Sequence, residues 1–379
     1  MKPGVYEDIS NADYHHGPGI SKSGLDLVHR SPMHYNAVVT AANDHTPTPA
    51  QERGTQAHAI ILEPDVFTAT YCLALRRSDV PDAIDDREVL VEMVNKLNET
   101  RLPKLSTSGK KDELIERIIA EVAPRNADVG ALASAGELAN MKGDELKAII
   151  TADNADREGK LSTSGSRHEL ADLLRANGQP VTLWSDVLAE WTENNPGRQV
   201  LSEEVWQQLH DMRDAVINHP AAGALLESYP GEAEKSVYWN DKTTGVLCRC
   251  RPDWWRDDNI LVDLKTTEDA STEGFAKSIA NYRYDVQAAY YLDGVEAATG
   301  KRPKAFVFIA VEKKQPYGVG VYVLDAASLD LGRAQYQHDL AIYAECLAND
   351  NWPGYGDKIQ TISLPAWHAN KNAHLVDVA

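Results

Sequence analysis

Two short apolar runs in the second half of the chain, residues 245–250 and 259–264, are the clearest strand signals. Between them lies a charged segment, Trp254 to Asp258, of a kind that is common in turns. Apolar runs on either side of a turn-like segment predict a β-hairpin. The alternation of side chains along each strand then decides which residues share a face.

Each side of this predicted hairpin carries one acid. Asp253 follows the first strand, Asp263 lies in the second, and Lys265 is two residues further on. Residues two apart in a strand point to the same face, so Asp263 and Lys265 should share one site. Two carboxylates can hold a hard divalent cation and leave positions open for water and phosphate, which suits phosphodiester hydrolysis. The simpler alternative is a surface hairpin in which Asp263 and Lys265 only form an ion pair.

Helical and strand-like patterns cover most of the remaining chain. A helix over 284–298 brings Gln287 and Tyr291, which are four residues apart, onto one face. Further helices are expected at 23–28, around His58, at 205–216 and at 326–348, and further strands at 67–75, 234–239, 305–311 and 318–324. This order predicts an α/β fold with a central mixed sheet flanked by helices. Glu234, at the start of one strand, is either an accessory acid or part of a solvated strand end.

The middle of the chain contains an internal repeat. The segment KLSTSG at Lys104 to Gly109 recurs at Lys160 to Gly165, 56 residues later. A helix-like run precedes each copy and another follows it, so the pattern helix, extended linker, helix is expected twice. We therefore expect a mostly helical inserted region at 85–178, between an N-terminal part of the core at 1–84 and a C-terminal part at 179–379.

Composition changes this picture only in part. The net charge of −19 over 379 residues disfavours a broad nucleic-acid footprint, because phosphate binding draws on Lys and Arg. A locally basic channel is still compatible with DNA, and its candidates are Arg249, Arg251, Lys265, Lys277 and Arg283. The chain has no long apolar run and no signal-peptide pattern, so a cytoplasmic protein without membrane contact is expected. Four scattered cysteines predict neither a disulfide framework nor a zinc site.

Several motifs together resemble one enzyme family. The spacing from Pro252-Asp253 to Asp263-Leu264-Lys265 resembles the PD-(D/E)xK nuclease signature, in its exonuclease VIII (RecE-type) and RecB-like branch. Gln287 to Tyr291 matches the QxxxY motif of that branch, and Gly54 to Pro64, GTQAHAIILEP, resembles its GTxxHxxxLEP box. The opening ISKSGLD, Ile20 to Asp26, is also similar to the start of exonuclease VIII-like chains. The repeats resemble SAP and HeH modules, which often contact DNA.

The resemblance implies a PD-(D/E)xK nuclease core with Asp253, Asp263 and Lys265 as catalytic residues. It implies that His58, Asp253, Asp263 and the Leu264 carbonyl bind the metal and that Gln287 and Tyr291 hold the substrate strand. Mg²⁺ is the implied cofactor, with Mn²⁺ as a substitute.

The resulting hypothesis is a Mg²⁺-dependent exodeoxyribonuclease that degrades one strand of linear duplex DNA, 5′ to 3′, for phage-type recombination by single-strand annealing. Its expected partners are double-stranded DNA ends, a single-strand annealing protein and further copies of itself, in the cytoplasm of a bacterial host. One alternative is a structure-specific or CRISPR-associated-type endonuclease of the same fold. Another is a non-catalytic DNA-binding or scaffold protein.

Overall fold

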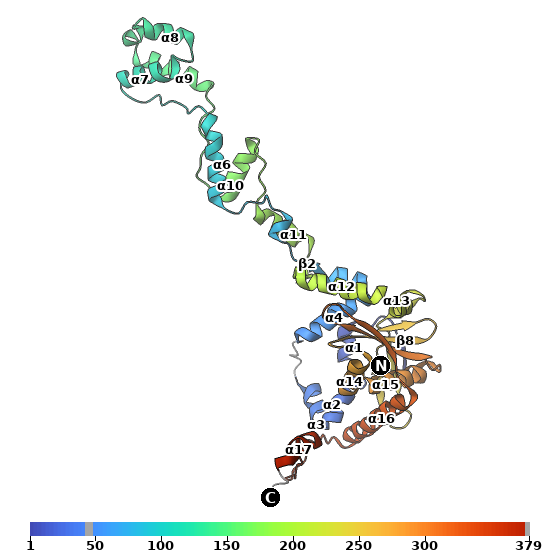
Figure 1. The fold of residues 1–379 in the computed structure, drawn as a ribbon. Coiled ribbons are helices and arrows are strands. Elements are labelled where there is room, and N and C mark those ends of the chain that lie inside the picture. Colours follow the sequence, from blue (N-terminus) through green and yellow to red (C-terminus); the bar gives the residue numbers. More distant parts are fainter. Residues whose placement is uncertain (42–47, 376–379) are drawn as a thin grey trace. The chain divides into compact units, whose positions relative to one another are not determined.

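The chain forms two compact units. The computed structural model describes residues 1–41 and 48–375. Met1–Leu73 and Gln199–Ala379 make up the first unit, here named the core unit, and Ala74–Arg198 make up the inserted unit (Figure 1). The inserted unit is wider than the region expected from the repeats, 85–178, because Ile84 pairs with Leu183 and so joins the flanking segments to it.

A five-stranded sheet is the centre of the core unit. Its strand order is β10-β9-β8-β7-β4. The strands are β4 (Gly231–Ala233), β7 (Trp254–Arg256), β8 (Ile260–Thr267), β9 (Ala305–Glu312) and β10 (Val319–Val323). β8 and β9 are parallel, whereas the other neighbours are antiparallel. The predicted α/β fold with a mixed sheet is therefore confirmed.

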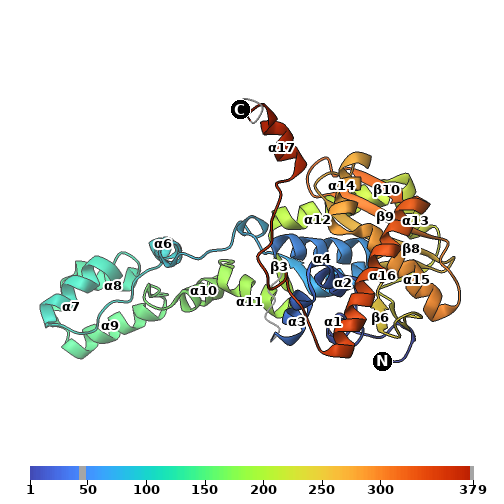
Figure 2. The same ribbon diagram turned by 90° about the horizontal axis from the view of Figure 1, so that it is seen from below.

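Helices pack against both faces of this sheet. The helices of the core unit are α1 (Asn11–His16), α2 (Lys22–Arg30), α3 (Pro32–Thr40), α4 (Pro49–Leu62), α5 (Pro64–Thr70), α12 (Glu203–Asn218), α13 (Pro220–Glu227), α14 (Thr272–Tyr282), α15 (Tyr284–Thr299), α16 (Ala326–Asn349) and α17 (Ala366–Asn372). Leu261 and Phe308 pack with α2, α14, α15 and α16 on one face. Val262, Leu264 and Ile309 pack on the other face with α4, α5 and α12, and α4 and α12 lie side by side (Figure 2).

The predicted hairpin of 245–250 and 259–264 is wrong in its first strand, which does not pair with the second. β6 (Leu247–Cys250) pairs with β5 (Ser236–Asn240) in a separate three-stranded sheet, β1-β5-β6, in which β1 is Gly4–Tyr6. The segment expected to turn is itself the strand β7, which pairs with β8. Pro252 has no N–H to donate to a ladder, so the first strand ends before it. Trp254 and Trp255 favour a strand because large aromatic side chains pack well on a sheet.

The predicted strand at 67–75 is also shorter than expected. Pro64 begins the helix α5, consistent with the preference of proline for the first turn of a helix, and only Tyr71–Leu73 form the strand β2. β2 pairs in parallel with β3 (Gln199–Leu201). The chain leaves the core unit after β2 and returns to it at β3, so these paired strands flank the insertion.

The inserted unit consists of helices around two separate apolar clusters. Its helices are α6 (Arg87–Thr100), α7 (Lys111–Arg117), α8 (Ala127–Ser134), α9 (Gly143–Ala155), α10 (Arg167–Ala176) and α11 (Trp184–Asn194). α6 packs on α10, and α7 packs on α9 (Figure 1). The first helix of each repeat therefore packs on the second helix of the other repeat.

Hydrogen bonds at equivalent positions repeat this exchange. Asn98 of the first repeat donates its side-chain N–H to Leu161 O at 3.0 Å and accepts from Leu161 N at 2.7 Å. Asn154 of the second repeat makes the same two bonds to Leu105, at 2.8 and 2.7 Å. Each extended linker thus lies against the helix that precedes the other linker.

Among residues 1–41 and 48–375, no helix is both long enough and apolar enough to span a bilayer.

Candidate metal centre

β8 carries the acid and the amine that were expected to share a site. Asp263 is fully buried on the sheet face that α15 covers, where the Gln287 side-chain N–H donates to its Oδ1 at 2.5 Å. Lys265 Nζ lies 2.6 Å from Asp263 Oδ2. Gln287, which is expected to hold the substrate strand, has its buried amide in contact with Asp263. The three side chains form one connected group at this face of the sheet.

Asp253 reaches the same region from the loop between β6 and β7. Its Oδ2 accepts a hydrogen bond from the backbone N–H of Leu264 at 2.8 Å. The N–H and C=O of one strand residue point to the same side, so the Leu264 carbonyl also points toward the Asp253 side of β8. His58, on α4, lies with Nδ1 3.5 Å from Asp253 Oδ2. The helix with the GTxxH motif thus meets the aspartate of the PD motif.

Glu234 completes a possible ligand group. One ligand atom each from His58, Glu234 and Asp253 lie within 4.8 Å of one another. Ala233 pairs with Trp254 across the antiparallel strands β4 and β7, so the next residue, Glu234, lies opposite Asp253. Its backbone N–H donates to Asp253 O at 3.3 Å, and its φ of 57° is in the left-handed region, which is uncommon for a residue other than glycine. The acid at a strand start was visible in the sequence, but the strand pairing was not.

Burial and mutual repulsion change the titration of these acids. Burial and the charge of Asp253 raise the pKa of Glu234 to about 8. Burial raises the pKa of Asp263 to about 6, and the charge of Asp253 adds to this while Lys265 opposes it. Burial lowers the pKa of Lys265, but the charges of Asp263 and Asp253 outweigh it, so the pKa lies above its ordinary value. Lys265 is therefore an ammonium ion at neutral pH.

A cavity of about 690 Å³ opens beside this group. His58, Glu234, Asp253 and Tyr291 are among the residues that line it. Burial raises the pKa of the Tyr291 phenol well above its ordinary range, so the hydroxyl stays protonated. A cavity of this size can admit a nucleotide-sized group next to the acids.

The residues fit a divalent cation. Carboxylates are common ligands of Mg²⁺ and Mn²⁺, and Mn²⁺ accepts an imidazole better than Mg²⁺ does. Asp263 Oδ2 is buried and, apart from its ion pair with Lys265, makes no hydrogen bond. Burial, together with the charge of Asp253, raises the pKa values of Glu234 and Asp263, and a bound cation would favour the ionised form of both acids.

Two arginines expected in a DNA channel are buried against other parts of the core unit. Arg249 and Arg251 are 8% and 6% exposed. Arg249 donates to the backbone carbonyls of Gly17 and His15, and Arg251 donates to the Ser236 hydroxyl. Alternating strand positions direct Cys248 and Cys250 into the core and the arginines to the opposite face, where Arg249 binds the N-terminal segment. Arg251 binds β5, lies 3.6 Å from Glu234 and lines the cavity. Lys277, in contrast, is exposed on α14.

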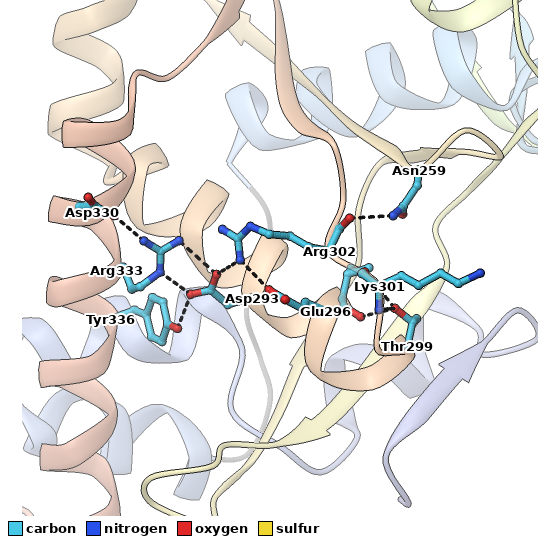
Figure 3. Close-up of polar contacts among 10 residues, drawn as sticks. Asn259, Asp293, Glu296, Thr299, Lys301, Arg302, Asp330, Arg333 and Tyr336 are labelled. Atoms are coloured by element: carbon cyan, nitrogen blue, oxygen red, sulfur yellow. Dashed lines mark hydrogen bonds and ion pairs between the residues drawn. The ribbon is translucent and has the colours of Figure 1, made fainter.

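The far end of α15 is anchored by a charged network (Figure 3). Asp293 accepts from Arg333 Nε and from the Tyr336 hydroxyl, both at 2.7 Å, and from Arg302 Nη1 at 3.0 Å. Burial raises the pKa of Asp293, but these hydrogen bonds outweigh it and hold the pKa below its ordinary value. Since Arg333 and Tyr336 belong to α16, the network fixes the helix that carries Gln287 and Tyr291 to its neighbour.

Comparisons with known proteins agree with this geometry at the level of the domain family. None of the curated proteins searched matches the chain. Among solved structures, a provisionally assigned exonuclease from Eubacterium rectale is 12% identical, with a TM-score of 0.34 over 60% of this chain and 85% of its own. An alkaline exonuclease from Laribacter hongkongensis is 16% identical, with a TM-score of 0.23 over 34% of this chain and 66% of its own. These likenesses are too low to carry an argument.

A family model gives the stronger result. Residues 184–365 match the PDDEXK-like domain of unknown function DUF3799. The matched segment contains both aspartates, Lys265 and the QxxxY helix, whereas His58 lies outside it. Residues 184–365 of this chain therefore resemble a PDDEXK-like domain, and the match covers slightly less than half of the chain.

Proposed function

We propose that the protein is a Mg²⁺-dependent exodeoxyribonuclease that degrades one strand of linear duplex DNA from an end. The observation that carries the proposal is the meeting of His58, Glu234 and Asp253 beside a cavity, next to the buried pair Asp263 and Lys265. A PDDEXK-like domain match over this region supports a nuclease in particular.

In this proposal Asp253, Asp263, His58 and the Leu264 carbonyl hold the metal, and Glu234 is a further ligand. A bound divalent cation would polarise the phosphoryl oxygen and lower the pKa of a water molecule. Asp253 is aligned for this role by the N–H of Leu264, and Asp263 by the amide of Gln287. Mn²⁺ is expected to replace Mg²⁺, because the proposed ligands include a nitrogen.

Lys265 orients the reacting groups and is not a base in this proposal. Its raised pKa keeps a proton on Nζ, so the ammonium can donate to a phosphate oxygen or to the attacking water. The Tyr291 hydroxyl, protonated on the cavity wall, can donate to the substrate strand. Gln287 acts indirectly, by holding Asp263 in its buried position.

Duplex ends as substrate, 5′ to 3′ polarity and a single-strand annealing protein as partner are also part of the proposal. The motifs that resemble exonuclease VIII-like chains support these points. The same motifs support the proposal that several copies associate and that the protein acts in phage-type recombination. The overall negative charge restricts DNA contact to a local surface.

Purified protein with Mg²⁺ should be incubated with linear duplex and with covalently closed circular duplex of the same sequence. We expect loss of the linear DNA alone, complete inhibition by a chelator, and release of label from the 5′ end first. Nicking of the circle would instead identify an endonuclease. Absence of cleavage of either DNA, in a folded protein that binds Mg²⁺, would reject the nuclease proposal.

A further inference from the structure

The ring of Tyr284 lies close to two ammonium groups from distant parts of the chain. Lys265 Nζ is 4.9 Å from the ring centroid, and Lys22 Nζ is 5.8 Å from it. Lys265 belongs to the candidate site, whereas Lys22 is the first residue of α2 in the ISKSGLD motif. Ammonium groups near an aromatic ring are attracted by its negative face. The ring is therefore a physical link between α2 and the site.

The ammonium group of Lys22 is bound by other groups of the protein. Its Nζ donates to the backbone carbonyl of Tyr282 at 2.6 Å and lies 2.8 Å from Asp26 Oδ2. The side chain is only 13% exposed. Such an ammonium is poorly available to a substrate phosphate, so any effect of Lys22 on the site passes through the groups that it binds.

The Tyr282 carbonyl lies at the junction between α14 and α15, and Asp26 binds this junction through Arg283. Arg283 joins the two helices with a φ of 55°, in the left-handed region that side chains other than glycine seldom adopt. Its guanidinium pairs with Asp26 at 2.9 Å and with Asp339 at 2.5 Å. Lys22 and Asp26, four residues apart on α2, thus hold the junction at Tyr282 and at Arg283.

The junction determines where α15 begins, and α15 carries the groups that touch the acids. Tyr284 is its first residue and contacts Lys265, and Gln287, three residues later, donates to Asp263. A shift of the first turn of α15 would move both contacts together. Displacements of about 1 Å in such supporting groups can lower rates by about a hundredfold.

We propose that Lys22 is a positioning residue for the candidate site, acting through Tyr282 and the ring of Tyr284 on Lys265. This inference rests on the proposed nuclease function for its kinetic consequences. It gives the ISKSGLD motif a role beyond starting a helix, since the lysine between the two serines is the residue that reaches the site.

The kinetic test compares Lys22→Met with Lys22→Arg and Tyr284→Leu. We expect Lys22→Met to lower kcat on linear duplex by about tenfold with KM within about threefold, because orientation is lost and binding is not. The arginine can still bind the Tyr282 carbonyl and Asp26, so Lys22→Arg should retain at least about a third of the activity. Lys242→Met, an exposed lysine between β5 and β6, is the matched control and should behave as wild type.

A double variant separates positioning from a direct contact with DNA. If Lys22 acts through Tyr284, Lys22→Met combined with Tyr284→Leu should be no slower than Tyr284→Leu alone. Multiplying effects, a rise in KM with kcat unchanged, or no effect of Lys22→Met would each overturn the proposal. If Lys22→Met does not fold, Asp26→Asn loosens the same junction and is measured in its place.

A second measurement does not depend on cleavage. An amine-reactive reagent applied to the chelator-treated full chain, followed by peptide mass spectrometry, gives the rate at which Lys265 is modified. We expect several-fold faster modification in Lys22→Met than in wild type, Lys22→Arg or Lys242→Met. Equal rates in all four chains would overturn the positioning role even if the protein is a nuclease, whereas faster modification in a chain that cuts no DNA would leave the role standing and reject only the proposed function.

Discussion

Asp253 and Leu264, eleven residues apart, are joined by a hydrogen bond in which the Leu264 backbone N–H donates to Asp253 Oδ2 at 2.8 Å. The bond joins the loop before β7 to the middle of β8. It lies next to the pair formed by Trp254, the first residue of β7, and Val262. The position of the first aspartate is therefore set by the strand that carries the second. Any change that moves β8 should disturb both acids at once.

Replacing Asp263 with Asn should abolish cleavage while DNA binding is kept. The substitution keeps the shape of the side chain and removes a negative charge that the metal needs. We expect a rate loss of about a thousandfold or more, which corresponds to roughly 4 kcal/mol of lost transition-state stabilisation. The rate should be measured with Mg²⁺ on linear duplex, and binding by filter retention with a chelator present. Glu268→Gln, an exposed acid just after β8, is the control, and near-normal cleavage by Asp263→Asn would remove Asp263 from the centre.

Replacing His58 with Ala should weaken metal binding and leave the fold intact. His58 is 30% exposed on a cavity wall, so truncation creates no closed cavity and Tm should change little. We expect a higher Mg²⁺ concentration for half-maximal cleavage, with partial recovery in Mn²⁺. His16→Ala, an exposed histidine on α1, should match wild type. A large fall in Tm with an unchanged metal requirement would show a packing role.

In chelator, the stability of the folded protein should fall as pH rises from about 4.5 to about 8. Glu234 has an ordinary pKa of 4.5 and a folded value of about 8, so between these values the folded state holds a proton that the unfolded state has released. Above about pH 8 Glu234 is ionised in both states, so it makes no further contribution to the slope. Glu234→Gln should flatten the dependence of Tm on pH in this window, and Mg²⁺ should raise the Tm of wild type more at pH 8 than at pH 6. A slope that Glu234→Gln does not change would contradict the assigned titration.

Deleting residues 85–178 should leave a folded core unit that still cuts short duplexes. The deletion joins Ile84 to Gln179 and leaves four residues, 179–182, before Leu183, and the segment that matches the family model stays complete. Val181→Ser should be included, because removal of α6 and α10 exposes this side chain. Cooperative melting and cleavage of a 20-base-pair duplex are the measurements. An insoluble chain would mean that the inserted unit is needed for the fold of the core.

Periodicity and motif spacing predicted the mixed sheet, the helix with Gln287 and the shared face of Asp263 and Lys265, because these depend on local patterns. The strand partners could not be predicted in this way. β6 and β7 differ in partner because Pro252 separates them, and Glu234 reaches Asp253 only through pairing between β4 and β7. The roles of Arg249 and Arg251 also depend on contacts with distant backbone, which a charged residue in a strand does not reveal.

The exchange between the repeats was beyond prediction for a different reason. Identical KLSTSG linkers carry no information on which copy each helix contacts. Asn98 binds Leu161 in the same way as Asn154 binds Leu105. Recombination between the identical linkers that removes residues 105–160 would join Lys104 to Leu161. The product would keep α6, one linker and α10, which already pack together and form a closed module. Chains with one module should therefore fold as well as chains with two. Circular dichroism of the chain that lacks residues 105–160 would test this by measuring whether the remaining helices are formed. Module number can thus vary during evolution without an intermediate that exposes half a core.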